Sequence, residues 1–255
     1  MTRNWISLTS IARKEMIRIF RIWVQTLVPP VITITLYFII FGSFIGSQLG
    51  NIGGYDYMAF IAPGLIMMSI ITNSYSNTVS SFFSTKFQRN VEELLVSPTP
   101  NWVMVIGYIS GGMTRGICVG ILVSVVSLFF VRLPPFNLAF IVLFALLTSF
   151  VFSLAGMING IFAKKFDDIS IIPTFVITPL TYLGGVFYSI SLLPEFWQTL
   201  SRANPVVYMI GGFRYGFLGI SDINVWLGLG MLVLFSVLLF SFTLYLLKKG
   251  TGVRA

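Results

Sequence analysis

The sequence predicts an all-α polytopic membrane protein with six transmembrane helices. Of its 255 residues, 56% are hydrophobic and 9% are charged, whereas a soluble domain carries about 25% charged residues. The apolar residues gather in runs that can cross a bilayer, since a span needs about 20 mostly apolar residues. We expect a single membrane domain over 1–255, with no soluble domain attached.

Residues 1–23 are predicted to form an amphipathic interfacial helix before the first span. Basic side chains lie on one face at Arg3, Lys14, Arg18 and Arg21. Apolar side chains recur at helical spacing on the opposite face, at Trp5, Leu8, Ala12, Met16, Ile19, Phe20 and Trp23. Such a helix lies flat on an anionic leaflet. The alternative is a basic segment next to the membrane that only sets the orientation.

The six predicted spans lie near 24–45, 59–83, 102–131, 138–162, 169–189 and 226–247. If the N-terminus is cytoplasmic, the outer segments carry only Arg132, Arg202 and Arg214, and Arg115 lies within a span. The rest of the 16 Lys and Arg residues fall on the inner side. An excess of positive charge marks the cytoplasmic side, so both termini are predicted to be cytoplasmic.

A strongly polar segment at 86–98 interrupts the apolar sequence. Its Arg89, Glu92 and Glu93 fall within about one helical turn, and prolines follow it. This pattern predicts a short amphipathic helix at the membrane surface that receives a push from a partner protein. The residues expected to couple the partner to the spans are Arg89, Glu92, Glu93, Leu94, Leu95 and Pro98.

Two spans carry polar side chains that lipid would not accept cheaply. The candidate substrate path consists of Ser69, Asn73, Ser76 and Ser80 in the second span and Thr174, Thr178 and Thr181 in the fifth. The alternative for the second span is hydrogen bonding between packed helices. Two prolines make the fifth span a broken or bent one, which often marks a transport pathway.

The third span holds small residues that let another helix approach closely. Gly107, Gly111, Gly112 and Gly116 give overlapping GxxxG spacings, which indicate helix packing or a dimer contact. Arg115 on the same span must face an interior or reach toward the surface, and either a structural partner or a functional role would explain it. The segment 190–217 is too apolar for a solvated loop and is predicted to form two short re-entrant helices.

Several classes of protein are excluded. The sequence has no His, and Cys118 is its only cysteine, so soft-metal sites, His-based catalysis and an intrachain disulfide are absent. No GxxxxGK(S/T) phosphate loop occurs. The net charge of +8 does not indicate nucleic acid, because the basic residues form no single patch. We predict no catalytic residue, no metal site and no cofactor bound by this chain.

Four motifs resemble those of the ABC-2 type transporter permeases over nearly the whole chain. They are the Glu-Glu-Leu-Leu-Val-Ser-Pro of 92–98, the Phe-Asp-Asp-Ile-Ser of 166–170, the Pro-rich block of 173–188, and Asn204-Pro205 with the Phe-Arg-Tyr-Gly of 213–216. The resemblance implies a permease of the bacterial inner (plasma) membrane with six spans, which exports its substrate as a homodimer. It also implies two copies of a cytoplasmic ABC ATPase that binds ATP and Mg, with 86–98 as the coupling helix that enters a groove on that subunit.

Two other functions remain open from the residues alone. An ion-coupled secondary transporter would need acids or other ion ligands at mid-bilayer, and none of the eight acidic residues falls mid-span in this assignment. A membrane assembly subunit that transports nothing is the other alternative. The resemblance does not name the substrate.

Overall fold

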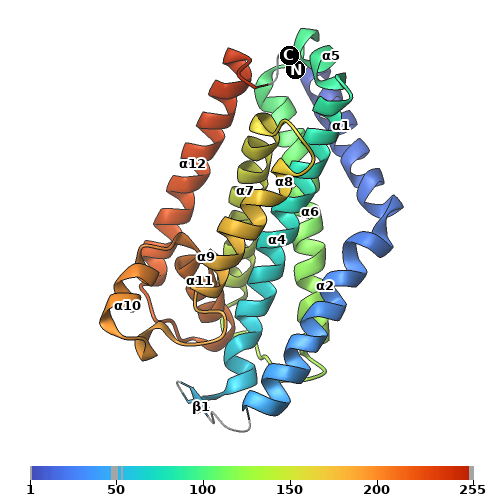
Figure 1. Ribbon diagram of the computed structural model, residues 1–255. Coiled ribbons are helices and arrows are strands. Elements are labelled where there is room, and N and C mark those ends of the chain that lie inside the picture. Colours follow the sequence, from blue (N-terminus) through green and yellow to red (C-terminus); the bar gives the residue numbers. More distant parts are fainter. Residues whose placement is uncertain (1, 47–50, 53, 253–255) are drawn as a thin grey trace.

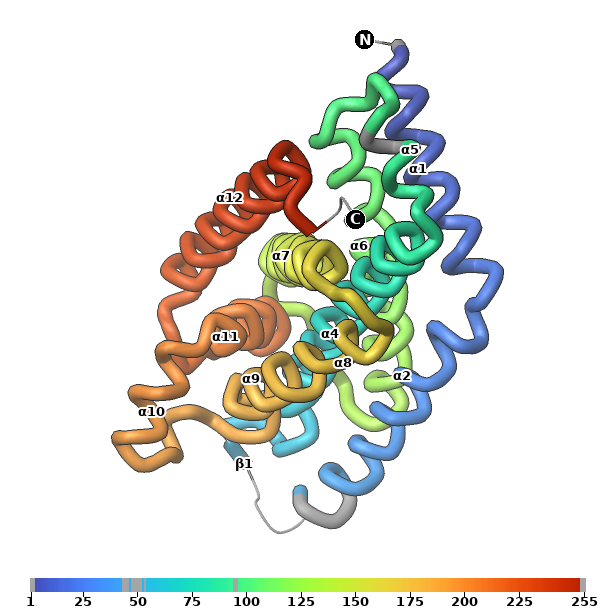
Figure 2. The backbone as a smooth tube through the Cα atoms, turned by 45° about the horizontal axis from the view of Figure 1, so that its top comes forward, coloured from blue at the N-terminus to red at the C-terminus, as the bar shows by residue number. Residues whose placement is uncertain are grey.

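The structure is a bundle of long helices built around one central helix, α4 (Tyr57–Phe87) (Figures 1 and 2). It is a computed structural model that describes residues 2–46, 51–52 and 54–252; the side chains of Leu94 and Leu95 are among the few left out. Helix α4 makes its most extensive contacts with α6 (Asn101–Ser127) and α7 (Leu138–Phe162). Because α4 is enclosed by its neighbours, most of its side chains are buried.

The remaining elements are mostly helical. In chain order they are α1 (Thr2–Arg21), α2 (Trp23–Tyr37), the π-helix η1 (Phe38–Ile45), strands β1 (Asn51–Ile52) and β2 (Tyr55–Asp56), α5 (Asn90–Val96), α8 (Asp168–Ile172), the π-helix η2 (Pro173–Ile177), α9 (Thr178–Tyr182), the 3₁₀ helix η3 (Ile190–Leu192), α10 (Glu195–Arg202), α11 (Pro205–Leu218) and α12 (Val225–Lys249). The two strands pair antiparallel, with Asn51 opposite Asp56.

Polar residues at helix starts explain where several of these helices begin. The Asn137 side chain accepts hydrogen bonds from the backbone N–H groups of the first turn of α7, and Asn224 does the same for α12. Asn204 and Asp56 each accept one such bond at the starts of α11 and α4. These caps satisfy N–H groups that a helix cannot pair internally, which matters most in a bilayer.

Five helices among the described residues are long and apolar enough to cross a membrane. They are α2 with the start of η1, then α4, α6, α7 and α12. The predicted fifth span, 169–189, is not one of them, because its helical part ends at Tyr182. The run from α8 through η2 to α9 covers only 168–182, about 22 Å at 1.5 Å per residue, against a hydrocarbon core of about 30 Å.

Charged and polar segments gather at the two ends of the bundle. The N-terminus, α5 and the C-terminal end of α12 lie at one end, and the β1–β2 hairpin lies at the other (Figure 1). Helices α10 and α11 lie in the half that contains the hairpin (Figures 1 and 2). The chain is thus an all-α polytopic membrane protein.

Candidate functional site

The predicted coupling segment consists of the last turn of α4, a sharp reversal and the short helix α5. Arg89 adopts a φ of 61°, in the left-handed region, and this ends the first helix and starts the second in a new direction. At the other end, Ser97 is extended, as a residue before a proline tends to be. These two boundaries make α5 seven residues long, shorter than the predicted 86–98.

One side chain anchors α5, and acidic side chains cover its outer surface. Val91 is 1% exposed and packs in a cluster with Phe82 and Tyr108. Glu92 and Glu93 lie in the first turn of α5 and are exposed. Arg89 and Pro98 are also exposed, whereas the side chains of Leu94 and Leu95 lie outside the described part of the chain. The helix therefore presents carboxylates to whatever lies beyond this end of the bundle.

The base of this segment is tied to the loop that follows α7. The Lys86 ammonium donates to the carbonyl oxygens of Ile161 at 2.5 Å and Ala163 at 2.7 Å. These carbonyls belong to the last turn of a helix, where a cation is favoured. In the same loop, the backbone N–H groups of Lys164 and Lys165 donate to Asp168, and these bonds lower the pKa of that carboxyl.

A buried polar network joins α1 to α4, and the sequence analysis missed its central residue. Glu15 is 0% exposed; its carboxylate accepts from the Ser81 hydroxyl at 2.6 Å and pairs with Arg18 at 3.0 Å. The same guanidinium donates to the Asn77 side-chain oxygen at 2.9 Å. Arg18 thus turns inward instead of lying on the outer basic face. The spacing of Ile11, Glu15 and Ile19 could have indicated this buried face.

The polar residues predicted in the second span follow one face of α4. Ser69 and Asn73 are each 5% exposed, and Ser76 and Ser80 are half-buried. The first three line a cavity of about 270 Å³ between α2, α4 and α6. Arg115 of α6 lines the same cavity, so the structure brings this charge together with Ser69, Asn73 and Ser76 of the predicted path.

The threonines of the fifth predicted span lie elsewhere. Thr174 and Thr178 are exposed and Thr181 is buried, and none of them lines that cavity. The hydroxyl of Thr178 donates to the carbonyl of Pro173 at 2.9 Å, and that of Thr181 donates to the carbonyl of Thr178 at 2.8 Å. In this conformation the two halves of the predicted path are not joined.

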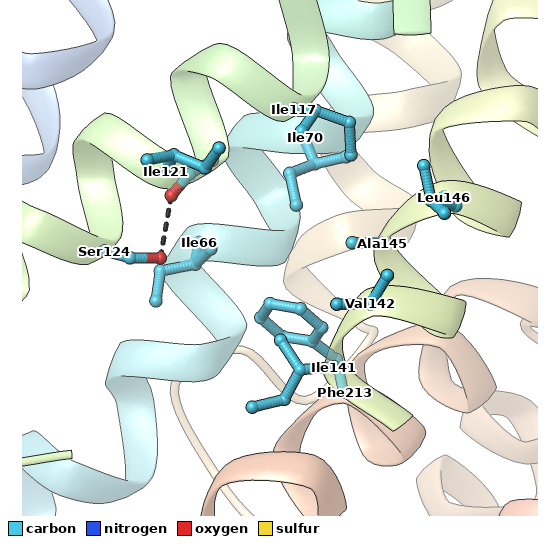
Figure 3. Close-up of a pocket in the computed structure, with 11 residues that line it drawn as sticks. Ile66, Ile70, Ile117, Ile121, Ser124, Ile141, Val142, Ala145, Leu146 and Phe213 are labelled. Carbon is cyan, nitrogen blue, oxygen red and sulfur yellow. Dashed lines mark hydrogen bonds between the residues drawn. The ribbon is translucent and has the colours of Figure 1, made fainter. Parts of the chain in front are cut away.

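A second cavity is almost entirely apolar. It measures about 170 Å³ and lies between α4, α6, α7 and α11 (Figure 3). Its one polar side chain, Ser124, donates its hydroxyl to the Gly120 carbonyl of its own helix at 2.8 Å (Figure 3). Because the hydroxyl hydrogen of Ser124 is used within its own helix, the cavity suits only an apolar group.

The glycines of the third span lie against other helices of the same chain. A Cβ on Gly107 would meet Ile11 of α1, and one on Gly111 would meet Glu15. Gly112 and Gly116 approach the backbone and side chains of α4 around Ser74. These glycines therefore allow α1 and α4 to pack closely on α6.

A second missed residue lies in the half of the bundle that holds the hairpin. The sequence predicts Arg214 in an outer segment, but its side chain is buried, with 3% of its surface exposed. Its guanidinium lies 3.8 Å from the centre of the Phe60 ring. It donates to the carbonyl of Gly185 at 2.6 Å and approaches Asp222 at 3.9 Å. Asp222 in turn accepts from the Ser189 hydroxyl. This cluster joins α4, the turn after α9, and α11.

The described residues contain no group of three or more His, Cys, Asp or Glu side chains that could hold a metal ion. The polar features of this chain are instead a surface helix, a buried network beside it and a membrane cavity with one charge. These features suit a protein that binds a partner or a ligand and changes conformation.

Comparisons with known proteins identify the family of this chain. The family model described as ABC-2 type transporter matches residues 7–218. The inner membrane transport permease YadH of Escherichia coli strain K12 is 60% identical over 251 residues, which is 98% of each chain, and its counterpart in Shigella flexneri matches equally. Nodulation protein J of Neorhizobium galegae is 26% identical over 84% of this chain and 82% of its own. This chain therefore belongs to the ABC-2 type transporter family.

Proposed function

We propose that this chain is the membrane-spanning subunit of an ABC exporter of the bacterial inner membrane. In this proposal two copies of the chain form a homodimer. Two copies of a separate cytoplasmic ATPase subunit bind to this homodimer and drive transport. ATP and Mg bind to the ATPase, and this chain binds neither. The relatives named as inner membrane transport permeases support the location and the transport role.

The observation that carries the proposal is the placement of α5. This helix sits at the end of α4, the 31-residue helix at the centre of the bundle. The buried side chain of Val91 anchors α5 to the bundle, whereas Glu92 and Glu93 are exposed. A force applied to these carboxylates would pass directly into the helix that lines the Arg115 cavity.

The remaining parts of the proposal concern topology. The end that carries α5 and both termini is cytoplasmic, which agrees with the distribution of Lys and Arg. The segment α8–η2–α9 is the sixth, broken span, and α10 and α11 are re-entrant. Helix α1 lies at the inner leaflet. The side of it that contacts the lipid carries the exposed Trp5 and Phe20.

Charge reversal on α5 tests the coupling. The double variant Glu92→Lys with Glu93→Lys should abolish co-purification with the partner ATPase, or reduce the ATPase activity of the complex at least about tenfold, because like charges at an interface cost several kcal/mol. Glu195→Lys, an exposed acid on α10 at the opposite end, is the matched control and should change neither. Unchanged binding and activity in the double variant would contradict the proposal.

The buried Glu15 favours one alternative, an ion-coupled transporter. A buried acid can carry a proton through a cycle of opening and closing. Its contacts oppose this role, because Arg18 and Ser81 already engage both of its oxygens. Transport by proteoliposomes that contain this chain alone, driven by a pH gradient without ATP and lost in Glu15→Gln, would support the alternative over the proposed function.

A further inference from the structure

The cavity between α2, α4 and α6 contains a charge that the protein itself does not neutralise. Arg115 is the only charged side chain among those that line it. Within the described residues the ion pairs are Arg18 with Glu15 and Arg214 with Asp222, so Arg115 has no acidic partner there. Its Nε atom is buried and has no hydrogen-bond acceptor in the described part of the chain. An unneutralised charge at membrane depth is costly, so a ligand that supplies the counterion would be favoured.

Glu15, the acid that packs against α6 one helical turn before Arg115, cannot serve as that counterion. It lies against Gly111. Both of its oxygens are already engaged, one by Ser81 and the other by Arg18. The Glu15–Arg18 pair is neutral as a whole, so it leaves the positive charge of Arg115 uncompensated.

Three other polar side chains of the cavity leave oxygen atoms available and donate hydrogens to their own helix. The hydroxyls of Ser69 and Thr72 donate to the carbonyls of Leu65 and Met68 of the same helix. The Asn73 amide likewise donates to the carbonyl of Ser69. Their oxygens can therefore accept from hydroxyl groups of a ligand, while Arg115 provides the charged donors.

Most of the remaining wall is apolar. It includes Pro29, Pro30 and Ile34 of α2 and Met68 of α4. Beside the cavity, the outer surface of α2 exposes Ile32 and Leu36, on the side where lipid or a second subunit would lie. A ligand with a polar head and an apolar tail would fit this combination better than a small soluble anion.

We propose that this cavity binds the anionic head, a phosphate or carboxylate, of an amphiphilic molecule, with Arg115 as its counterion. The anionic group of the head lies at Arg115, its hydroxyl groups donate to the oxygens of Ser69, Thr72 and Asn73, and the tail leaves along α2. Two sources share this chemistry, a phospholipid of the surrounding membrane and the transported substrate. Only the second of these rests on the transport function proposed above.

Native mass spectrometry of the purified full-length chain in a maltoside detergent tests the site without any ATPase. Phosphatidylglycerol, which is anionic, should bind at least about tenfold more tightly than phosphatidylcholine, because truncation of a buried charge pair typically costs that much or more. Arg115→Gln should remove this preference, and Arg115→Lys should retain part of it. Arg202→Gln, an exposed arginine on α10, should bind like the wild type.

A second variant keeps the test decisive if Arg115→Gln does not fold. Thr72→Phe fills the cavity from an exposed position whose hydroxyl bonds only its own helix, and it should weaken phosphatidylglycerol binding while Arg115 remains. Equal binding of both lipids by the wild type, an unchanged preference in folded Arg115→Gln, or unchanged phosphatidylglycerol binding in Thr72→Phe would overturn the proposal.

The two sources are separated in nanodiscs that contain the chain, its ATPase and phosphatidylglycerol. Occupancy that falls when ATP is added identifies the bound amphiphile as transported substrate. Occupancy that persists through ATP hydrolysis identifies it as a resident lipid. Both outcomes retain the site, and neither depends on the result of the Glu92 and Glu93 experiment.

Discussion

The Ser81 hydroxyl of α4 donates a 2.6 Å hydrogen bond to the fully buried carboxylate of Glu15 in α1. This bond joins the N-terminal helix to the central helix about one and a half turns before Lys86, where the predicted coupling segment begins. Arg18 completes the link, because it contacts both the Glu15 carboxylate and Asn77. Any tilt of α4 driven through α5 would therefore carry α1 with it.

Loss of the Glu15 charge should destabilise the protein. Glu15→Gln leaves Arg18 without its ion-pair partner but preserves an oxygen for Ser81, and Arg18 remains partly solvated. We expect a cost of about 1–3 kcal/mol, at the low end for a broken buried pair. Thermal unfolding in detergent should give a lower Tm, whereas the exposed Glu195→Gln should give the wild-type value.

A methyl group at Gly112 should disturb the packing of α6 on α4. Its Cβ would lie 2.7 Å from the Ser74 carbonyl oxygen and would also clash with Thr78 and Ser153. Gly112→Ala should cost about 1–3 kcal/mol, as overpacking does. Gly230→Ala in α12 is the matched control: nothing lies within 4 Å of its Cβ, and alanine should stabilise that helix by about 0.5–1 kcal/mol. Equal Tm changes would contradict the packing described here.

Replacement of Lys86 should loosen the contact between the coupling segment and the loop after α7. Lys86→Met would leave the carbonyls of Ile161 and Ala163 without their donor. The cost should be about 1–3 kcal/mol. Hydrogen exchange over 159–168 should accelerate, and the exposed Lys165→Met should leave it unchanged. Slow exchange in Lys86→Met would mean that the ammonium does not hold this turn.

The Arg214 cluster should require arginine itself. The guanidinium stacks on Phe60 and donates to two backbone carbonyls, those of Phe60 and Gly185, and a lysine cannot provide that planar geometry. Both Arg214→Gln and Arg214→Lys should lower the stability by about 3 kcal/mol or more. Accelerated hydrogen exchange over 183–190 would locate the effect. A wild-type Tm in Arg214→Lys would show that charge alone is sufficient.

The coupling segment shows how far local pattern extends. Glu92, Glu93 and the following prolines identified a short surface helix, because charge and periodicity are properties of neighbouring residues. Its start at Asn90 followed from the left-handed backbone at Arg89, which no pattern of side chains indicates in a residue other than glycine. The fifth predicted span shows the same limit, since hydropathy extended past Tyr182 while the helix did not.

The sequence alone determined that this chain is an integral membrane protein and which of its helices are apolar. It also determined where polar segments interrupt those helices and which family the motifs resemble. These conclusions depend on composition and on spacing within single helices. Only the tertiary structure decided that Glu15 and Arg18 face inward, that Arg214 is buried, and that Arg115 shares a cavity with Ser69 and Asn73. The physical reason is that the partners of a buried charge come from helices distant in sequence, and helix packing alone brings them together.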